Sequence, residues 1–285
     1  MEKEKVSFVD VYTWTKQQLK NAGIFDASEL DFLICEAIGV KRGELPLIKE
    51  ITKKQKESIE SATKRRICGE PITKIFGRTE FYGYNFIVTN DVLSPRQETE
   101  ILVENVLKFA KSGDKILDLC TGSGIIAISL AKNVDAKITA SDISIKALDV
   151  AKQNANINNV NIDFLQSNLF ENLKSDEKFD IVVSNPPYIA TKDIDNLDKE
   201  VKDFDPLLAL DGGCDGLKFY REIIEKCPKF LTNDGMLFLE IGYNQKNDVI
   251  NLLQKDFENI VCKKDYQGQD RVIFAKLKQK GKEKC

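Results

Sequence analysis

The sequence predicts an α/β protein in which a small helical bundle precedes a doubly wound, mostly parallel sheet. Three observations support this fold class. Strand and helix patterns alternate from Lys115 onward, a glycine-rich loop follows the first of these strands, and the chain before residue 75 carries only helical patterns. Since parallel strands are connected by crossover helices, this alternation puts helices on both faces of the sheet.

Residues 1–75 are expected to form the helical bundle. Apolar residues recur at helical spacing over Val6–Lys20 and Asp26–Val40, and Thr52–Ile67 is predicted to be a polar helix. The basic run Lys53–Arg66 within this last helix indicates either a solvated face or a docking face for a partner with phosphate or acidic groups.

Residues 76–95 are predicted to form a β-hairpin that links the bundle to a second domain, expected over residues 96–285. Aromatic and β-branched residues alternate around Gly83, and Asn90-Asp91 is a turn signal.

Seven strands are predicted in the second domain. They are Lys115–Leu119, Lys137–Asp142, Asn161–Gln166, Phe179–Ser184, Met236–Ile241 and two strands within Glu258–Lys276 that are joined at Gly268. Helices are predicted between them over Gly124–Ala131, Ser144–Asn156 and Leu217–Phe230. The final strand pair indicates one antiparallel member in the sheet.

The composition argues against several classes of protein. With 42 basic and 45 acidic residues the formal charge is −3, which argues against a protein held to nucleic acid mainly by bulk electrostatics. No apolar run reaches the ~20 residues that a membrane-spanning helix needs. The charged N-terminal segment lacks the apolar core of a secretory signal. We therefore expect a cytoplasmic protein without a membrane partner, and a monomer.

The chain contains no histidine and seven cysteines. The lack of histidine removes Ser-His, Cys-His and His-metal mechanisms. The cysteines, at positions 35, 68, 120, 214, 227, 262 and 285, form no C-x-x-C pair and predict reduced thiols. Chemistry is therefore expected to use carboxylates, amides, Lys, Tyr, backbone groups or a cofactor, without a metal.

The segment Asp118-Leu-Cys-Thr-Gly-Ser-Gly124 follows the first strand of the sheet and opens its first helix. Glycines in such a loop let the backbone turn tightly and approach a ligand. Asp142 comes 18 residues after Gly124, at the end of the second strand, where a carboxylate can accept both hydroxyls of a ribose. Together they predict an adenosine site at the carboxyl edge of the sheet.

The same loop fits the dinucleotide fingerprint, since Gly122-x-Gly124-x-x-Ala127 has its spacing. The loop alone therefore leaves open an NAD-dependent dehydrogenase and an S-adenosylmethionine-dependent methyltransferase. Asp118 favours the second, because an acid there can hold the cationic amino-acid end of S-adenosylmethionine but would repel a pyrophosphate.

The motif Asn185-Pro186-Pro187-Tyr188 stands at the end of a predicted strand. Two prolines fix the backbone and remove two N–H donors, so that the Asn185 amide and backbone carbonyls are expected to face a cleft. Tyr188 offers a flat face. Such a site can hold both N–H groups of a planar nitrogen, one on Asn185 and one on the Pro186 carbonyl, and aim its lone pair at a methyl donor. A strand-ending turn is the plain alternative.

These motifs together make the chain resemble the release factor glutamine methyltransferase family (PrmC, also called HemK). The resemblance spans roughly residues 65–275. It rests on the order and spacing of Gly69-Glu-Pro, Phe81-x-Gly83-x-x-Phe86, SPRQETE (94–100), DLCTGSG, NPPYI, Phe204-x-Pro206, DGGCDGLKFYR (211–221), LEIG (239–242) and Gly268-Gln-Asp-Arg271.

The resemblance implies the fold of a class I S-adenosylmethionine-dependent methyltransferase with an N-terminal substrate-docking bundle. It implies methylation of the glutamine amide in the Gly-Gly-Gln loop of translation termination factors, which leaves S-adenosylhomocysteine. The implied cofactor residues, with Asp118 and Asp142, are Cys120, Thr121, Gly122, Ser123, Gly124, Ile143, Asn168, Leu169 and Asn185. Asn185, Pro186, Pro187 and Tyr188 would bind the glutamine, with Asn185, Pro186 and Tyr188 as the catalytic set. Arg96, Glu98 and Thr99 would close the pocket.

Three positions depart from the family pattern. Gln97 stands where a proline is usual, and Asn168 stands where an acid commonly contacts the adenine amino group. Cys120 takes a position usually filled by glycine or another small residue. An Asn oxygen can still accept the adenine hydrogen bond.

Two related activities share the Asn185–Tyr188 motif. One is glutamine methylation of a large-subunit ribosomal protein, and the other is methylation of adenine or guanine amino groups in nucleic acid. Ile189 and the segment 211–221 resemble the release-factor branch more closely. The near-neutral charge disfavours a direct nucleic acid substrate. A protein that only binds S-adenosylmethionine or NAD would not need an intact Asn185–Tyr188 motif.

The stretch Asp193–Asp205 is acidic and follows the NPPY motif. We expect a mobile lid or a partner-contact helix, with an ordinary solvated helix as the plain alternative.

Overall fold

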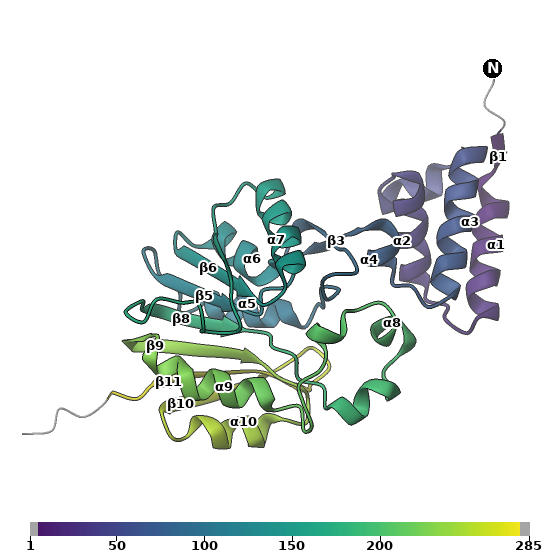
Figure 1. The fold of residues 1–285 in the computed structure, drawn as a ribbon. Helices are drawn as coiled ribbons and strands as arrows, with labels where there is room; N and C mark the ends of the chain where they lie inside the picture. Colours follow the sequence, from purple (N-terminus) through teal and green to yellow (C-terminus); the bar gives the residue numbers. More distant parts are fainter. Residues whose placement is uncertain (1–4, 280–285) are drawn as a thin grey trace, which may run out of the picture. The chain divides into compact units, whose positions relative to one another are not determined.

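The computed structural model describes residues 5–279, and the chain divides into two compact units (Figure 1). One unit contains residues 5–77 together with Lys199–Phe204. The other contains Arg78–Asp198 and residues 205–279.

The first unit is built on three helices that begin at side-chain caps. They are α1 (Phe8–Asn21), α2 (Ala27–Ile38) and α3 (Lys53–Ile67). Asp26 accepts the Glu29 N–H at 2.9 Å, and Thr52 forms a capping box with Gln55. The three predicted helices are therefore confirmed, with each end within two residues of its predicted position.

Shorter elements complete this unit and were not predicted, because three to six residues carry no readable period. They are β1 (Lys5–Ser7), which pairs antiparallel with β2 (Glu50–Thr52), the 3₁₀ turn η1 (Arg42–Leu47), α4 (Ile72–Phe76) and α8 (Lys199–Lys202). The core comes from all three long helices, with Leu19, Leu33 and Ile59 at most 1% exposed.

The basic run of α3 is partly used inside this unit. Arg66 is buried and pairs with Glu29 at 2.9 Å and with Glu200 at 3.0 Å, while Arg65 pairs with Glu70. Arg66, the last basic residue of the run, is therefore not solvated, whereas Lys64 and Arg65 are exposed.

The second unit opens with the predicted hairpin. Strands β3 (Arg78–Phe81) and β4 (Tyr84–Ile87) pair antiparallel, and Tyr82 and Gly83 both have positive φ in the two-residue turn.

A seven-stranded sheet forms the centre of the second unit. Its order is β10-β11-β9-β8-β5-β6-β7. The strands are β5 (Lys115–Leu119), β6 (Lys137–Asp142), β7 (Asp163–Gln166), β8 (Phe179–Ser184), β9 (Leu231–Glu240), β10 (Phe257–Lys264) and β11 (Asp270–Leu277). Only β11 runs against its neighbours, which confirms the predicted sheet with one antiparallel member.

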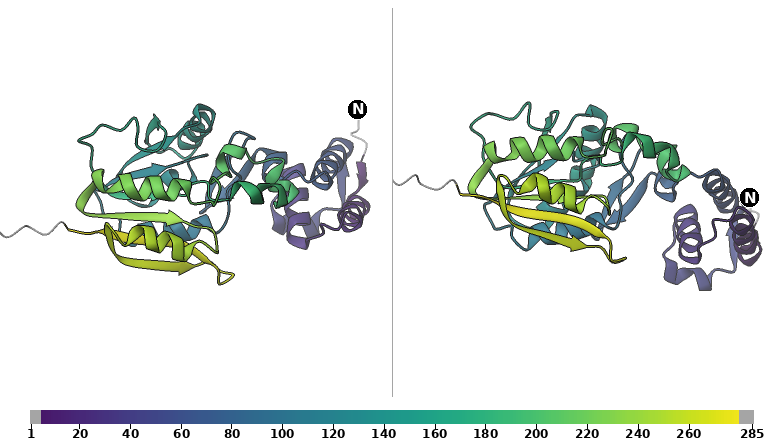
Figure 2. Two further views of the ribbon diagram at one scale, coloured as in Figure 1. Left: turned by 60° about the horizontal axis from the view of Figure 1, so that its bottom comes forward. Right: turned by 90° about the horizontal axis from the view of Figure 1, so that it is seen from below.

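Helices cover both faces of this sheet (Figures 1 and 2). One face carries α5 (Thr99–Leu107), α6 (Ile125–Asn133) and α7 (Ile145–Ile157), and the other carries α9 (Lys218–Lys226) and α10 (Lys246–Leu253). Successive strand residues serve opposite faces, so that Ile116 packs in the α5–α6 core and Leu117 in the α9–α10 core. Both are fully buried.

Helices α5 and α10 were not predicted. Helix α5 is buried on most sides, so its apolar residues form no single stripe, and α10 has only eight residues. Single 3₁₀ turns occur at η2 (Thr191–Asn196), η3 (Leu207–Ala209) and η4 (Cys227–Lys229). None of the helices within residues 5–279 is long and apolar enough to cross a membrane.

The strand order reverses at β5, which lies between β8 and β6. In open α/β sheets, ligands bind beyond the carboxyl ends of the strands at such a switch point. The loops after β5, β6 and β8 therefore mark the place of the site.

Candidate active site

A cavity of about 360 Å³ lies at this switch point, within the second unit. Its lining includes most of the predicted site residues, namely Arg96, Thr99, Cys120, Thr121, Gly122, Ser123, Asp142, Ile143, Asn168, Leu169, Asn185 and Pro187. Asp118, Gly124, Pro186, Tyr188 and Glu98 are not on the lining. One cavity therefore joins the glycine-rich loop to the first residue of the NPPY motif.

Asp118 lies beneath the loop rather than on the cavity surface. Its Oδ2 accepts hydrogen bonds from Thr121 Oγ1 at 2.6 Å and from the Ala127 N–H at 3.2 Å. Its Oδ1 is buried without a partner among the described residues. Burial raises the pKa of this carboxyl to about 7, and the bonds from Thr121 and Ala127 oppose that shift. An orphaned carboxylate oxygen fits a cationic group of a ligand nearby.

The loop backbone takes left-handed conformations at Cys120, Gly122 and Gly124. Cys120 has φ 60°, which strains a residue with a side chain and gives the physical reason for a glycine at this position. Burial raises the pKa of the Cys120 thiol, so the thiol stays protonated and is no nucleophile.

Asp142 is fixed by the backbone of two loops. Its Oδ2 accepts the Gly122 N–H and its Oδ1 accepts the Ser144 N–H, both at 2.9 Å. Each oxygen has a second lone pair, so the carboxylate fits a pair of hydroxyl groups. Burial raises the pKa of Asp142, and these backbone bonds oppose the rise.

Asn168 and Ile143 form another part of the cavity wall. The Asn168 Nδ2 group donates to Glu171 Oε1 at 2.9 Å, which assigns its Oδ1 the role of acceptor. Ile143 is 48% exposed and supplies an apolar surface. This wall fits the edge and face of a planar base.

The NPPY motif is divided by the fold. Asn185 and Pro187 line the cavity, whereas Pro186 and Tyr188 do not. The Asn185 Nδ2 group donates to Thr99 Oγ1 at 3.4 Å. Burial raises the pKa of the Tyr188 hydroxyl to about 12, so it stays protonated.

The backbone of the motif is held by neighbours that carry no charge. Gln245 donates from Nε2 to the Tyr188 carbonyl at 2.9 Å and accepts the Gly242 N–H at 2.9 Å. A Cβ atom at Gly212 would lie 2.8 Å from the Tyr188 Cα. This close approach explains Gly212, and a similar approach to the Tyr188 carbonyl oxygen explains Gly216.

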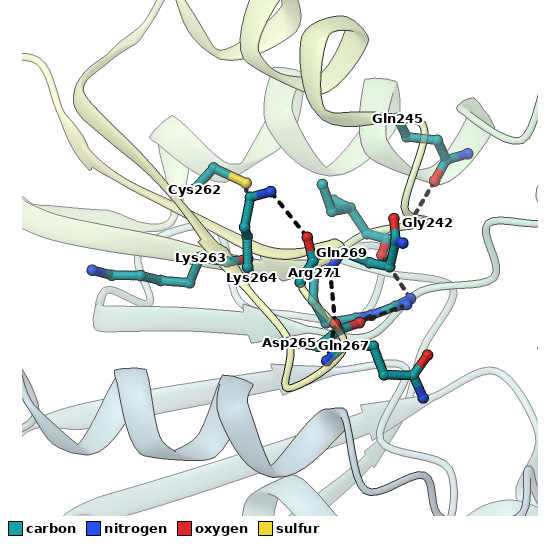
Figure 3. A network of polar contacts seen from close by, with 11 residues as sticks. Gly242, Gln245, Cys262, Lys263, Lys264, Asp265, Gln267, Gln269 and Arg271 are labelled. Carbon is teal, nitrogen blue, oxygen red and sulfur yellow. Dashed lines mark hydrogen bonds and ion pairs between the residues drawn. The ribbon is translucent and has the colours of Figure 1, made fainter.

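Two further residues, Glu240 and Arg271, lie close to the NPPY motif. The sequence analysis assigned no role to either of them. Glu240 is 2% exposed, and its Oε2 has no partner among the described residues. Arg271 donates from Nη2 to Asp265 at 3.1 Å and from Nη1 to the Ile241 carbonyl at 3.2 Å. Figure 3 shows Asp265 and Arg271 facing each other at the turn between β10 and β11. Both residues lie in motifs of the resemblance (LEIG and GQDR), which was the available signal.

Asp205 binds Ser94 and Arg96, which lie on the side of the cavity nearest the hairpin linker. Its carboxylate accepts Ser94 N and Ser94 Oγ at 3.0 Å each, and it pairs with Arg96 at 2.9 Å. Three other lining residues, Leu208, Lys218 and Phe219, were not predicted. Leu208 lies in no quoted motif, whereas Lys218 and Phe219 lie in segment 211–221 of the resemblance, to which no site role was assigned.

Comparison with known proteins agrees with this architecture. A family model described as "Methyltransferase small domain" matches residues 92–202, and one described as "PrmC N-terminal domain" matches residues 10–77. The release factor glutamine methyltransferase of Thermodesulfovibrio yellowstonii is 41% identical over 266 residues, covering 90% of this chain and 95% of the relative. That of Geobacter sulfurreducens is 36% identical over 272 residues, covering 94% and 95%.

A solved structure shares the fold alone. The 16S rRNA N2 G1207 methyltransferase RsmC of T. thermophilus has a TM-score of 0.52 and 18% identity, covering 70% of this chain and 50% of that chain.

The sheet and its cavity therefore define the chain as an enzyme of the methyltransferase class. Its full-length similarity is more specific: the chain belongs to the release factor glutamine methyltransferase family. The predicted fold class and family are confirmed, while the roles of individual site residues stay predictions.

Proposed function

We propose that this enzyme transfers a methyl group from S-adenosylmethionine to the side-chain amide of the glutamine in the Gly-Gly-Gln loop of translation termination factors. One observation carries the chemistry: Asn185 lines the same cavity as the glycine-rich loop and Asp142. The names of the relatives at 36–41% identity support the substrate. Termination factors act in the cytoplasm, where we propose that this enzyme works as a monomer.

Residues of the cavity fit S-adenosylmethionine, which supplies a methyl group on a positively charged sulfur when bound. Asp142 would accept the ribose hydroxyls, and Asn168 would accept from the adenine amino group through its Oδ1. The unpartnered Oδ1 of Asp118 supplies negative charge for the amino-acid end. Because Asp118 is buried beneath the loop, it would act on the ligand through its negative charge and by fixing the shape of the loop.

The acceptor amide needs orientation, because its nitrogen lone pair is delocalised. Asn185 Oδ1 and the Pro186 carbonyl would each accept one N–H of the glutamine amide. This holds the nitrogen with its lone pair toward the methyl donor, and rate enhancement comes mainly from position. Since the chain has no histidine, the released proton is expected to pass to water.

Two alternatives remain candidates for the test: a glutamine of a large-subunit ribosomal protein, and an amino group of a nucleic acid base. The likeness to the rRNA methyltransferase concerns the fold only. No observation within residues 5–279 favours either over the termination factor.

Methyl-labelled S-adenosylmethionine tests the proposal directly. The enzyme is incubated with a termination factor, either wild type or with Gln→Ala in its Gly-Gly-Gln loop. Label is expected on the wild-type factor alone. An unlabelled wild-type factor, or equal label on both, contradicts the proposal. Parallel reactions with ribosomal protein and with rRNA decide between the alternatives.

A further inference from the structure

Glu240 is a buried carboxyl group next to the candidate active site. It ends β9, is 2% exposed, and keeps its Oε2 without a hydrogen-bond partner among the described residues. A buried and incompletely paired carboxylate costs stability. An apolar residue of similar size at position 240 would make the fold more stable. The carboxyl group there therefore indicates a role in function.

Strand register brings Glu240 to Asn185. In the parallel pair of β8 and β9, Ser184 lies opposite Leu239, so the next residues of the two chains are Asn185 and Glu240. The side chains of Thr99 and Asn185 lie close enough to the Glu240 carboxyl to lower its pKa. Asn185 Nδ2 also points to Thr99 Oγ1 at 3.4 Å. The amide nitrogen of Asn185 thus faces α5 and β9.

Glu240 does not line the cavity, whereas Asn185 does. Glu240 can therefore act on an amide bound in the cavity only through Asn185. A side-chain amide can sit in two orientations related by a flip, and a carboxylate attracts its NH₂ end and repels its oxygen. A carboxylate behind Asn185 consequently selects the orientation with Oδ1 forward.

We propose that Glu240 is a positioning residue that accepts a hydrogen bond from Asn185 Nδ2 and so turns Asn185 Oδ1 toward the acceptor amide. The identity of that amide rests on the proposed function, but the orientation of Asn185 does not.

The ionisation of Glu240 makes this arrangement sensitive to pH. Burial raises the pKa of Glu240 to about 7, opposed by the bonds from Thr99 and Asn185 and by the charge of Arg271 on β11. The other ionisable groups that interact with it are Glu98 before α5, Tyr188 after β8 and Tyr220 on α9. A protonated Glu240 no longer distinguishes the two amide orientations by charge. Orientation is therefore strict above pH 7 and relaxed below it.

NMR of the enzyme labelled with ¹⁵N at asparagine tests the contact without any substrate. The Asn185 side-chain signals are assigned by their loss in Asn185→Ala. They are expected to shift with pH through a midpoint near 7 in the wild type, and to lose that shift in Glu240→Gln. A wild-type signal that does not titrate, or an equal titration in Glu240→Gln, overturns the proposal.

Kinetics test the consequence. At saturating S-adenosylmethionine and pH 8, kcat is expected to fall about 10-fold in Glu240→Gln and about 100-fold in Glu240→Ala, as for loss of one positioned polar group. The dissociation constant of S-adenosylmethionine should stay within about 2-fold. The wild-type kcat should decline below pH 7, and Glu240→Gln should lack this decline. An unchanged kcat, or a cofactor affinity that falls as much as kcat, contradicts the role.

Asp180→Asn is the matched control, because Asp180 lies on β8 at its opposite end and accepts the Lys115 N–H at 2.9 Å. It should keep both kcat and the decline below pH 7. If Glu240→Ala does not fold, Glu240→Gln decides. A wild-type enzyme that leaves termination factors unmethylated refutes the proposed function, while the NMR result on Glu240 still stands or falls separately.

Discussion

Asp118 and Glu240 share an unusual position among the carboxyl groups of this protein. Both are nearly inaccessible to solvent, both keep one oxygen without a hydrogen-bond partner in the described part of the chain, and burial raises the pKa of each to about 7. Groups with these properties destabilise the free enzyme at neutral pH. Both groups lie near one cavity. This indicates that they serve ligand binding and the orientation of Asn185, although they lower the stability of the folded enzyme.

Asp118→Asn should stabilise the free enzyme at high pH and weaken cofactor binding. The raised pKa means that the folded state binds a proton which the unfolded state releases between pH 3.8 and about 7. The favourable contribution of Asp118 is thus complete below pH 3.8 and is lost as pH rises through about 7. At pH 8 we expect a gain of about 1 kcal/mol or more in the free energy of unfolding, seen as a higher Tm.

The gain should shrink towards zero near pH 4, and the dissociation constant of S-adenosylmethionine should rise at least ~10-fold if charge holds the ligand. Asp163→Asn is the control, since Asp163 is an exposed partner of Lys137 and should change Tm little. A Tm difference that is the same at pH 4 and pH 8 would refute this account of Asp118.

At the scale of elements, the NPPY motif is shaped by segments far away in the sequence. Gly212 and Gly216 precede α9 and pack on the backbone of Pro187 and Tyr188, while Gln245 binds the Tyr188 carbonyl. Two prolines stiffen the motif itself, but these neighbours set where its carbonyls point.

Gly216→Ala should lower kcat at least ~10-fold with less effect on cofactor affinity. Its Cβ would collide with the Tyr188 carbonyl oxygen and its φ is +75°, so the motif must move. Gly113→Ala is the matched control, because Gly113 also has positive φ (+87°) but has no atom near its Cβ position. Steady-state kinetics and Tm are measured on both. Equal losses of activity in the two variants would show that backbone strain alone matters.

At the scale of the whole molecule, the acidic stretch Asp193–Asp205 is divided between the two units. Lys199–Phe204 belongs to the first unit, where Glu200 pairs with Arg66, and Asp205 belongs to the second, where it holds Ser94 and Arg96. Glu200 within α8 and Asp205 after it therefore both form structural ion pairs, and a role of this stretch as a lid remains a prediction.

Hydrogen exchange tests that role. Amides of residues 193–204 are expected to exchange more slowly when a termination factor and S-adenosylhomocysteine are both added, because a lid gains protection on closure. Amides of β5, in the centre of the sheet, serve as the internal reference and should not change. Unaltered exchange over 193–204 would leave an ordinary solvated segment.

Local patterns predicted much of the fold. Strand and helix periods predicted the sheet of β5–β11, its crossover helices and the three long helices of the first unit. Helix α5 was not predicted, because it is buried on most sides and its apolar residues form no single helical stripe. Cys120 and Gln97 illustrate a second limit, which concerns departures from the family pattern. The left-handed φ of Cys120 explains why glycine is usual at that position but not why this chain has cysteine, and nothing in the structure explains Gln97.

By itself, the sequence determined the glycine-rich loop, Asp142 and the NPPY motif, because each is a short run placed at the end of a strand. Only the tertiary structure decided that Glu240 lies beside Asn185, that Asp205 holds Arg96, and that Lys218 and Phe219 line the cavity. These relations depend on strand order and register, which join residues tens of positions apart. The physical reason is that a sequence pattern records which face a residue takes, while packing selects its neighbours.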